Sequence, residues 1–298
     1  MQRVSSKNLL GKSAAACLFF ALNTAFPLVC STGWAQNGVN APPSADASGN
    51  ALAYADLADL ASAAPLIINA EISQAISLKP EQSAGVPAGF RRAYITAKTE
   101  GLIRGDGGVA PNLSYLYDVA VNARGKMPKL KKQRVLLFAR AGTRPGEIQL
   151  VAPDAQIPAT PSNESTVRSI VAELLSAKAA PKIIGLGDAF YVAGTVEGEG
   201  ETQIFLRTDS GDPVSLSIVR RPGVEPRWAV ALGEIVDEAA ATPKPGTLLW
   251  YRLACALPPA LTPQSVRTLS VPDAEAARAD YKIVLAGLGP CGRTRTVR

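Results

Sequence analysis

Alternation of apolar and polar residues dominates the chain from residue 66 to residue 152 and predicts a series of β-strands. The expected strands cover residues 66–76, 90–103, 113–121, 134–140 and 147–152. The strand at 113–121 is the clearest, because apolar side chains occupy every second position. The run at 134–140 is apolar throughout its interior, so we expect both of its faces to be buried. Five successive strands with turn-rich connections favour a small antiparallel barrel or sandwich.

Helical spacing of apolar residues flanks these strands. Residues 54–63 carry apolar side chains on one face, and Pro65 ends the predicted helix. A second helix begins at Pro161 and ends before Pro181. Four more strands are expected at 190–196, 202–208, 214–220 and 227–236, followed by helices at 247–257 and from Ser270 onward. Ser270 with Asp273 resembles a capping box at the start of the last helix.

This order predicts an α+β fold made of two β-rich domains. We expect a five-stranded OB-like barrel or sandwich at 53–160, a connecting helix at 161–181, and an α+β domain at 182–298. The second domain would consist of an antiparallel sheet and a helix pair linked by a disulfide.

The N-terminal segment is typical of a secretory signal peptide. Arg3, Lys7 and Lys12 precede an apolar stretch at 13–26, and small residues lead to a cleavage site near Ala35. The apolar core of about 13 residues is shorter than the roughly 20 of a membrane-spanning helix, which would be the alternative. Cys30 raises a lipid anchor as a further alternative. Residues 36–52 form a polar tether that we expect to be disordered.

We therefore expect a periplasmic or secreted protein without a transmembrane segment in the mature chain. Removal of residues 1–35 would lower the net charge of the 298-residue chain from +6 to +3.

Composition excludes several classes of enzyme. The chain contains no His, so Ser-His, Cys-His and His-ligated metal sites are excluded. Neither S-x-x-K nor G-x-S-x-G occurs, although a hydrolase based on a Ser-Lys pair or on two carboxylates remains an alternative. No cofactor is expected.

Cys255 and Cys291 are the two cysteines that the mature chain would retain. In an oxidising compartment they predict one disulfide, which would close a loop of about 36 residues. The alternative is a reactive thiol, which would need a base to form the thiolate.

The densest run of charge is basic and lies between the third and fourth predicted strands. It contains Arg124, Lys126, Lys129, Lys131, Lys132 and Arg134. One interpretation is an anion site for an anionic envelope polymer or an envelope protein with an acidic surface. The other is a solvated loop whose lysines discourage pairing between strand edges. Arg293, Arg295 and Arg298 form a basic tail, expected to be mobile, with the same two interpretations. Nucleic acid is not an expected partner, because no aromatic residues interleave with the charges.

Two further motifs have a functional and a structural interpretation. Glu197, Glu199 and Glu201 alternate with glycines and would either bind Ca²⁺ or lie in a flexible hairpin turn. Residues 287–292 match G-x-G-x-x-G but follow a predicted helix, so the glycines are better explained as the end of that helix.

Several stretches resemble a family of exported proteins from sphingomonad-type Gram-negative bacteria. They are residues 54–60 with 64–67, 129–138, 150–154, 198–205, 250–255 and 288–291. The resemblance covers most of the mature chain, and it implies no catalytic residues because that family has no assigned activity. The first half also resembles barrels of the netrin or metalloprotease-inhibitor type, although their cysteine framework is absent.

Taken with the lack of a catalytic constellation, these features predict a non-catalytic binding or assembly module of the cell envelope. Inhibition of a secreted protease through the first domain is an alternative.

Overall fold

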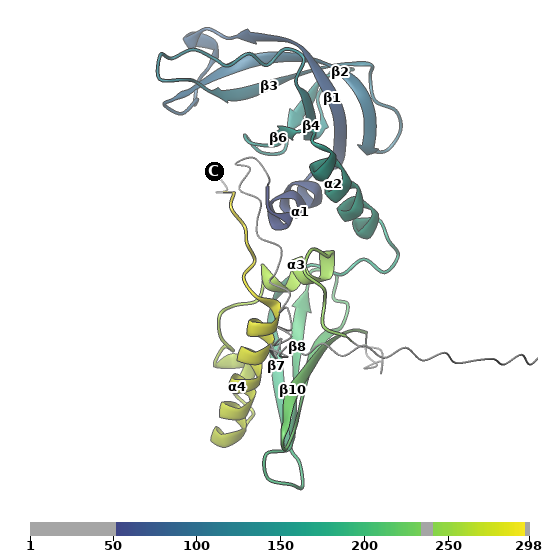
Figure 1. Cartoon of the computed structure of the whole chain (residues 1–298), viewed down its shortest axis with the longest axis vertical. Coiled ribbons are helices and arrows are strands. Elements are labelled where there is room, and N and C mark those ends of the chain that lie inside the picture. The colour runs from purple at the N-terminus through teal and green to yellow at the C-terminus, as the bar shows by residue number, and fades with distance from the viewer. Residues whose placement is uncertain (1–51, 234–240, 296–298) are drawn as a thin grey trace, which may run out of the picture. The chain divides into compact units, whose positions relative to one another are not determined.

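Figure 1 shows the computed structural model of the protein, which describes residues 52–233 and 241–295. The predicted signal peptide at 1–35, all but the last residue of the predicted tether, and Arg298 lie outside the described residues. The described chain is mixed helix and strand, as the sequence predicted.

Sheet A is an antiparallel, nearly closed, barrel-like sheet. Its strands are β1 (Leu66–Ser77), β2 (Phe90–Arg104), β3 (Asn112–Ala120), β4 (Arg134–Ala141), β5 (Ile148–Leu150) and β6 (Gln156–Pro158). The order is β3-β2-β1-β4-β5, and β6 also pairs with β4. A parallel bridge between Ser114 of β3 and Glu147, just before β5, joins the two ends of the sheet.

The interior of sheet A follows the predicted alternation. Ala93, Ile95 and Ala97 of β2 are fully buried, and they pack in one cluster with Leu113 and Leu137. The prediction that both faces of β4 are buried is confirmed, because every residue from Val135 to Ala139 is buried. Residues of β4 that point away from the interior belong to a second cluster, shared with the helices.

Two details of sheet A differ from the predictions. Ile76 is expected on the buried face of β1 but is 47% exposed, because the pairing of β1 with β2 shifts between Ile72 and Gln74. That shift turns the later residues of β1 to the opposite face. The fifth strand is shorter than predicted, and β6 was not predicted at all; β6 contributes only three residues to the sheet.

Two helices flank sheet A in sequence, α1 (Tyr54–Ala63) and α2 (Pro161–Leu174). Thr160 caps α2, where its hydroxyl accepts a hydrogen bond from the Asn163 N–H, and Pro161 occupies the first turn as predicted. Burial of α1 extends beyond the predicted face and includes the side chain of Asp56, which is fully buried.

Sheet B has four antiparallel strands in the order β10-β9-β8-β7. They are β7 (Ile183–Ala193), β8 (Gly200–Thr208), β9 (Val214–Arg221) and β10 (Val224–Leu232), so the first strand begins well before the predicted residue 190. Helix α4 (Val271–Leu288) packs on this sheet, mainly against β7 (Figure 1). Its cap is as predicted, with the Ser270 hydroxyl accepting from the Asp273 N–H.

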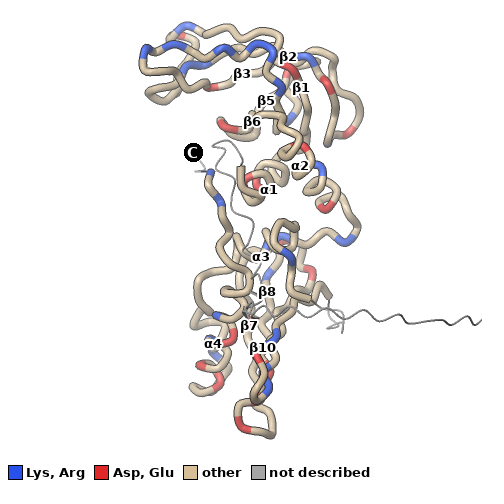
Figure 2. Tube along the Cα trace, viewed as in Figure 1, with Lys and Arg blue, Asp and Glu red and all other residues tan. Residues whose placement is uncertain are grey.

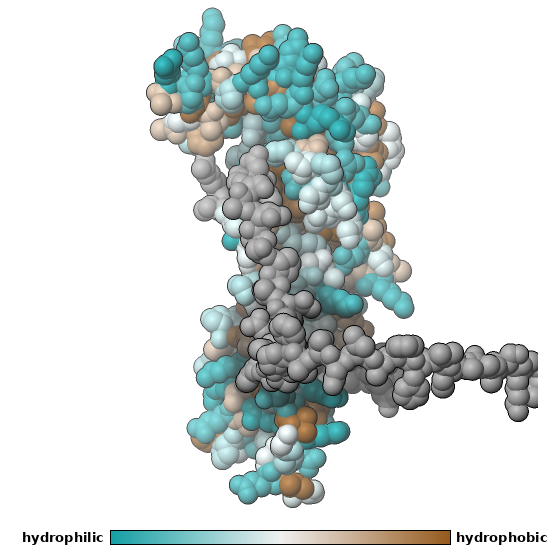
Figure 3. Space-filling view, viewed as in Figure 1, coloured by the Kyte–Doolittle hydropathy of each residue, from teal (hydrophilic) through white to brown (hydrophobic). Residues whose placement is uncertain are grey.

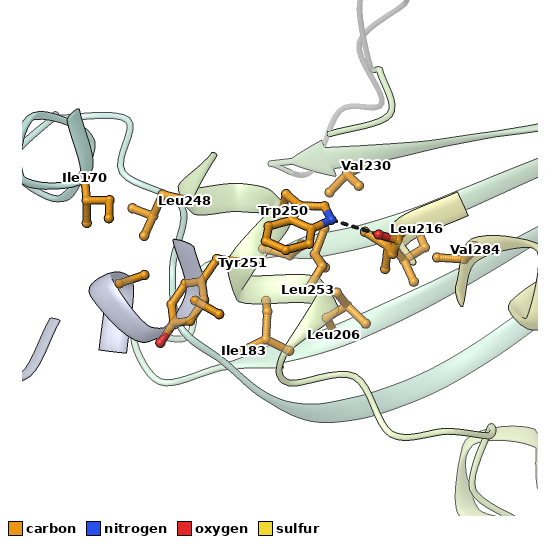
Figure 4. Packing of buried hydrophobic residues seen from close by; sticks show 14 of the residues in the cluster. Ile170, Ile183, Leu206, Leu216, Val230, Leu248, Trp250, Tyr251, Leu253 and Val284 are labelled. Atoms are coloured by element: carbon orange, nitrogen blue, oxygen red, sulfur yellow. Dashed lines mark hydrogen bonds between the residues drawn. The ribbon is translucent and has the colours of Figure 1, made fainter. Parts of the chain in front are cut away.

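A hydrophobic cluster surrounds the short helix α3 (Leu248–Ala254), as Figure 4 shows. The Trp250 indole N–H donates to the Leu288 carbonyl at 2.8 Å, which fixes α3 against the end of α4. The cluster includes residues on both sides of residue 181, so the division into two domains at that point stays a prediction. Within the described residues, no helix has both the length and the apolar character needed to cross a membrane.

The predicted disulfide between Cys255 and Cys291 is confirmed. Cys255 follows α3 and Cys291 lies shortly after α4, so the bond joins this helix pair as predicted. Helix α4 is also tied to sheet B by Asp280, which is buried and accepts hydrogen bonds from Thr202 of β8, at 2.5 Å, and from Arg220 of β9. A buried carboxylate with a cationic partner and a hydroxyl donor has its charge compensated.

Candidate functional site

The basic loop, residues 121–133 between β3 and β4, has a defined backbone. Oδ1 of Asn122 accepts from the N–H groups of Arg124 and Lys126, both at 3.0 Å, which holds a tight turn. Leu130 is only 7% exposed and inserts into the interior cluster of sheet A. The Lys132 N–H donates to the Ile72 carbonyl at 2.7 Å, so the end of the loop continues the β1–β4 ladder.

The basic side chains of this loop point into solvent. Five of them are exposed and form no ion pair with any described residue, namely Arg124, Lys126, Lys129, Lys131 and Lys132. Arg134, the sixth predicted residue, instead donates to Glu100 at 2.6 Å. No acidic residue occurs between Asp118 and Glu147, so no carboxylate within the loop can neutralise these cations.

A second loop adds cations at the same end of sheet A. Residues 78–89 connect β1 to β2 and include the short helix η1 (Pro80–Gln82). The Val121 N–H donates to the Gly89 carbonyl at 2.9 Å, which brings the two loops together. Lys79 of this loop and Arg91 at the start of β2 are exposed, as is the single acid of the loop, Glu81. Figure 2 shows how Lys and Arg gather on sheet A and its loops. The end of the barrel therefore presents a positive surface that attracts anions.

A groove of about 850 Å³ lies where the barrel is incompletely closed. This seam groove is lined by residues 92, 94, 114–116 and 118 of β2 and β3 on one side, and by 140–145 and 147–153 on the other. Arg92 and Asp118 form a bidentate ion pair at 2.7 and 2.8 Å within it. Tyr115, which also lines the groove, donates its hydroxyl hydrogen to Oε1 of Gln156 at 2.7 Å, and burial raises the pKa of this tyrosine.

The prediction that the basic tail is mobile is wrong for Arg293 and Arg295, the two of its arginines that the structure describes. Arg293 donates two hydrogen bonds to Asp59 of α1, and Arg295 donates two to Asp154. Between them, Thr294 donates through its N–H and its hydroxyl to Asp56, which also accepts from the Arg295 N–H. The tail is held because the acidic side chains of α1 and Asp154 meet its charges and its backbone donors.

Glu197 and Glu199 lie in the hairpin between β7 and β8, and Glu201 is the second residue of β8. The Gly194 N–H donates to the Glu199 carbonyl at 3.0 Å, and Gly198 has a φ of +84°, which a glycine adopts without strain. This geometry fits the predicted turn, and Glu197 and Glu201 are exposed on either side of it. No group of three side chains suited to holding a metal ion occurs in the described part of the chain.

The glycines of the G-x-G-x-x-G match end a helix, as predicted. Gly289 has a φ of +68° at the C-cap of α4, and its N–H donates to the Leu285 carbonyl at 3.1 Å. Cys255 and Cys291 are joined to each other, so neither supplies a thiol nucleophile.

Sequence reasoning missed the acidic side of α1 and the seam groove. Asp56 and Asp59 are three residues apart, which places both carboxylates near one face of the helix. That spacing is the signal in the sequence that could have indicated a cationic partner for this face. The seam groove had no comparable signal, because it arises where strands distant in sequence fail to pair.

Comparison with models of known protein families and with curated proteins finds no match to this chain.

Proposed function

We propose that the chain is a non-catalytic binding or assembly module of the cell envelope, and that the basic loop binds an anionic envelope polymer. The observation that carries this proposal is the set of five exposed cations, on a loop with a defined backbone, that form no ion pair with any described residue. Several arginines elsewhere in the described chain form an ion pair with a carboxylate, among them Arg92, Arg220 and Arg293. Cations left without such partners at one end of a barrel favour a ligand that supplies the negative charge.

The fixed backbone of the loop also supports binding. A ligand that binds a preorganised loop pays less conformational entropy than one that must order it. Leu130 and the Asn122 turn hold the ends of the loop, and the lysine side chains between them are free to follow a flexible polymer. Figure 3 shows a largely hydrophilic surface over sheet A, as expected for contact with a charged, hydrated ligand.

We further propose that sheet A is an OB-type barrel within a two-domain protein. The proposal is supported by the pairing of β1 with both β2 and β4, of β4 with β5, and by the parallel bridge that brings β3 beside β5. Such a partly open five-stranded barrel is a common scaffold for binding polymers. β6 is an addition to that scheme.

A periplasmic or secreted location rests on the predicted signal peptide at 1–35. It is supported by the disulfide between Cys255 and Cys291, because such bonds persist in oxidising compartments. The lipopolysaccharide of a Gram-negative envelope, with its phosphate groups, is one polymer of the required charge.

The test compares two variants with the same change in net charge. In the first, Lys126, Lys129 and Lys131 of the basic loop are replaced by Glu. In the second, three exposed lysines outside sheet A, Lys178, Lys244 and Lys282, are replaced by Glu. Binding of fluorescently labelled lipopolysaccharide to the purified protein is measured at low and high salt.

We expect the loop variant to bind about tenfold more weakly and to lose most of its salt dependence, whereas the control variant changes by about twofold or less. Equal weakening of both variants would attribute binding to net charge alone and would contradict the proposal. Failure of the unaltered protein to bind at low salt would also contradict it.

A further inference from the structure

Over most of its length, the edge of β3 that faces the seam groove has no partner among the described strands. The Ser114 N–H donates to the Gly146 carbonyl at 2.8 Å, on the side away from β2. Backbone groups of alternate residues in a strand point to the same side, so the N–H groups of Leu116 and Asp118 also face the groove. Neither of these two N–H groups donates a hydrogen bond to another described residue.

The space beside this edge is long enough to follow several residues of β3. The seam groove of about 850 Å³ lies along residues 114–118, and a second hollow of about 490 Å³ continues past Tyr117, Val119 and Ala120. On the far side of the seam groove lie β5 and the residues that follow it. The second hollow is lined there by β6, by the start of β4 and by Pro128, Leu130 and Gln133 of the basic loop. The two hollows together trace the course that one added strand would take.

The outer face beside the groove carries an apolar row that stops at the open edge. Ile76, Tyr94 and Leu116 are direct cross-strand neighbours on β1, β2 and β3, and they are 47%, 41% and 51% exposed. Cross-strand neighbours stabilise one another through side-chain contact. A further strand beside β3 would place one of its own side chains next to Leu116 and extend the row.

The charge around the groove favours an acidic strand. Arg92 and Asp118 neutralise each other, whereas Arg140 is exposed and forms no ion pair with a described residue. Arg144 is 85% exposed and approaches Glu147 only at 3.5 Å, a weak surface pair. The uncompensated charge on the rim is therefore positive.

We propose that the seam groove binds an extended acidic segment of a partner protein by strand addition to the edge of β3. The backbone of the segment accepts from the N–H groups of Leu116 and Asp118, and its carboxylates face Arg140 and Arg144. One apolar side chain of the segment packs beside Leu116, and the carboxylates lie two residues before and after it, on the same outer face. This goes beyond the proposed function, because the ligand is a peptide and the cations of the basic loop take no part in binding it.

The probe is a fluorescein-labelled octapeptide with Thr at every second position and with Glu and Val alternating at the positions between, so that Glu and Val share one face of the strand. Its binding to the full chain is followed by fluorescence anisotropy. Three control peptides keep most of its features. One has Lys in place of Glu, one has the same residues in two separate blocks, and one carries N-methyl groups on alternate residues. The last is made in both registers, because only one register blocks the edge that pairs with β3.

We expect the alternating acidic peptide to bind, and N-methylation in one register to weaken binding by about tenfold or more. Replacement of Arg140 by Glu should weaken binding about tenfold, whereas Arg227→Glu, at an exposed position on β10, should leave it within about twofold. In amide hydrogen exchange, the peptide should protect the N–H groups of Leu116 and Asp118.

Three results would overturn the proposal. The first is a lack of binding by the alternating acidic peptide. The second is equal binding of both N-methylated registers and the parent peptide. The third is loss of binding in the variant with Lys126, Lys129 and Lys131 replaced, with Arg140→Glu unaffected, which would place the peptide on the basic loop.

Discussion

Arg293 and Asp59 stand 234 residues apart in the chain, yet the guanidinium of Arg293 donates two hydrogen bonds to the Asp59 carboxylate, at 2.6 and 2.9 Å. The same carboxylate accepts from the Tyr251 hydroxyl at 2.6 Å. One acidic side chain of α1 is therefore the meeting point of α3 and the residues that follow the disulfide.

The ion pair between Arg293 and Asp59 should contribute modestly to stability. Its side chains are 36% and 18% exposed, so solvent screens the attraction, whereas the bidentate geometry strengthens it. We expect Arg293→Ala to lower the free energy of unfolding by about 1 kcal/mol, measured by urea denaturation. A matched control is Arg267→Ala, whose 3.9 Å approach to Asp188 should be worth much less. Equal effects of the two substitutions would contradict this assignment.

Replacement of Asp56 should cost more than replacement of Arg293. The Asp56 carboxylate is fully buried and accepts from the N–H groups of Ala53, Thr294 and Arg295. Asp56→Ala would leave these donors without a partner, so we expect a loss of roughly 2–4 kcal/mol. Amide hydrogen exchange at Thr294 and Arg295 provides the site-specific measurement.

A milder variant removes one hydrogen-bond donor and keeps the Asp56 carboxylate. Thr294→Val removes only the hydroxyl donor to Asp56 and leaves the backbone N–H in place. We expect it to cost about 1 kcal/mol and to keep the tail protected from exchange. If Asp56→Ala left exchange at Thr294 unchanged, the carboxylate would not be what holds the tail.

The disulfide should contribute substantially to stability. Cys255 and Cys291 are separated by 36 residues, and a loop of that length corresponds to roughly 3–4 kcal/mol in the chain-entropy model. We expect the double variant Cys255→Ala, Cys291→Ala to lose about this amount in urea denaturation. Reduction of the unaltered protein, verified by mass, should give a similar loss. A reduced protein as stable as the oxidised one would contradict the expectation.

Stability should fall at alkaline pH through Tyr251. Burial, and then the hydrogen bond to Asp59, raises the pKa of Tyr251 to about 12 from an ordinary value near 10. The neutral hydroxyl is thus favoured in the folded state, so its contribution is complete below about pH 10 and is lost as the pH rises through about 12. The stability difference between the unaltered protein and Tyr251→Phe should shrink over that interval.

Tyr281→Phe is the control for that experiment. Its hydroxyl donates to the Pro258 carbonyl at 2.7 Å, and burial raises its pKa further than that of Tyr251. The corresponding difference should therefore persist to higher pH. A parallel decline for both variants would indicate general alkaline unfolding and would remove Tyr251 as the specific cause.

Most regular elements could be predicted because their residues repeat with the period of the element. Leu113 to Val119 alternate onto the barrel interior, and Val167, Ile170 and Val171 recur at helical spacing on α2, where all three are buried. Both patterns depend only on neighbours in the sequence. Ile76 shows where this fails, because a single register shift in β1 reverses the face that alternation assigns.

The candidate site was predictable only in part. The basic loop could be recognised from its composition, and its five cations are exposed and form no ion pair with any described residue, whereas anion binding by them stays a prediction. Arg134 of β4 forms an ion pair with Glu100 of β2, on the other side of β1. Arg293 and Arg295 form ion pairs with acidic residues that are distant in the sequence. Partners of this kind are fixed by tertiary packing and leave no periodic trace.

The attachment of the tail to α1 determines when, during synthesis of the chain, α1 can reach its final packing. Asp56 and Asp59 leave the ribosome long before Thr294 and Arg295, which follow more than 230 residues later. Until then the Asp56 carboxylate lacks the donors of these two residues and has only the neighbouring Ala53 N–H, so it must stay hydrated because a poorly paired buried charge is costly. The final packing of α1 therefore requires synthesis to reach residue 295, and a product truncated before residue 293 would lack it.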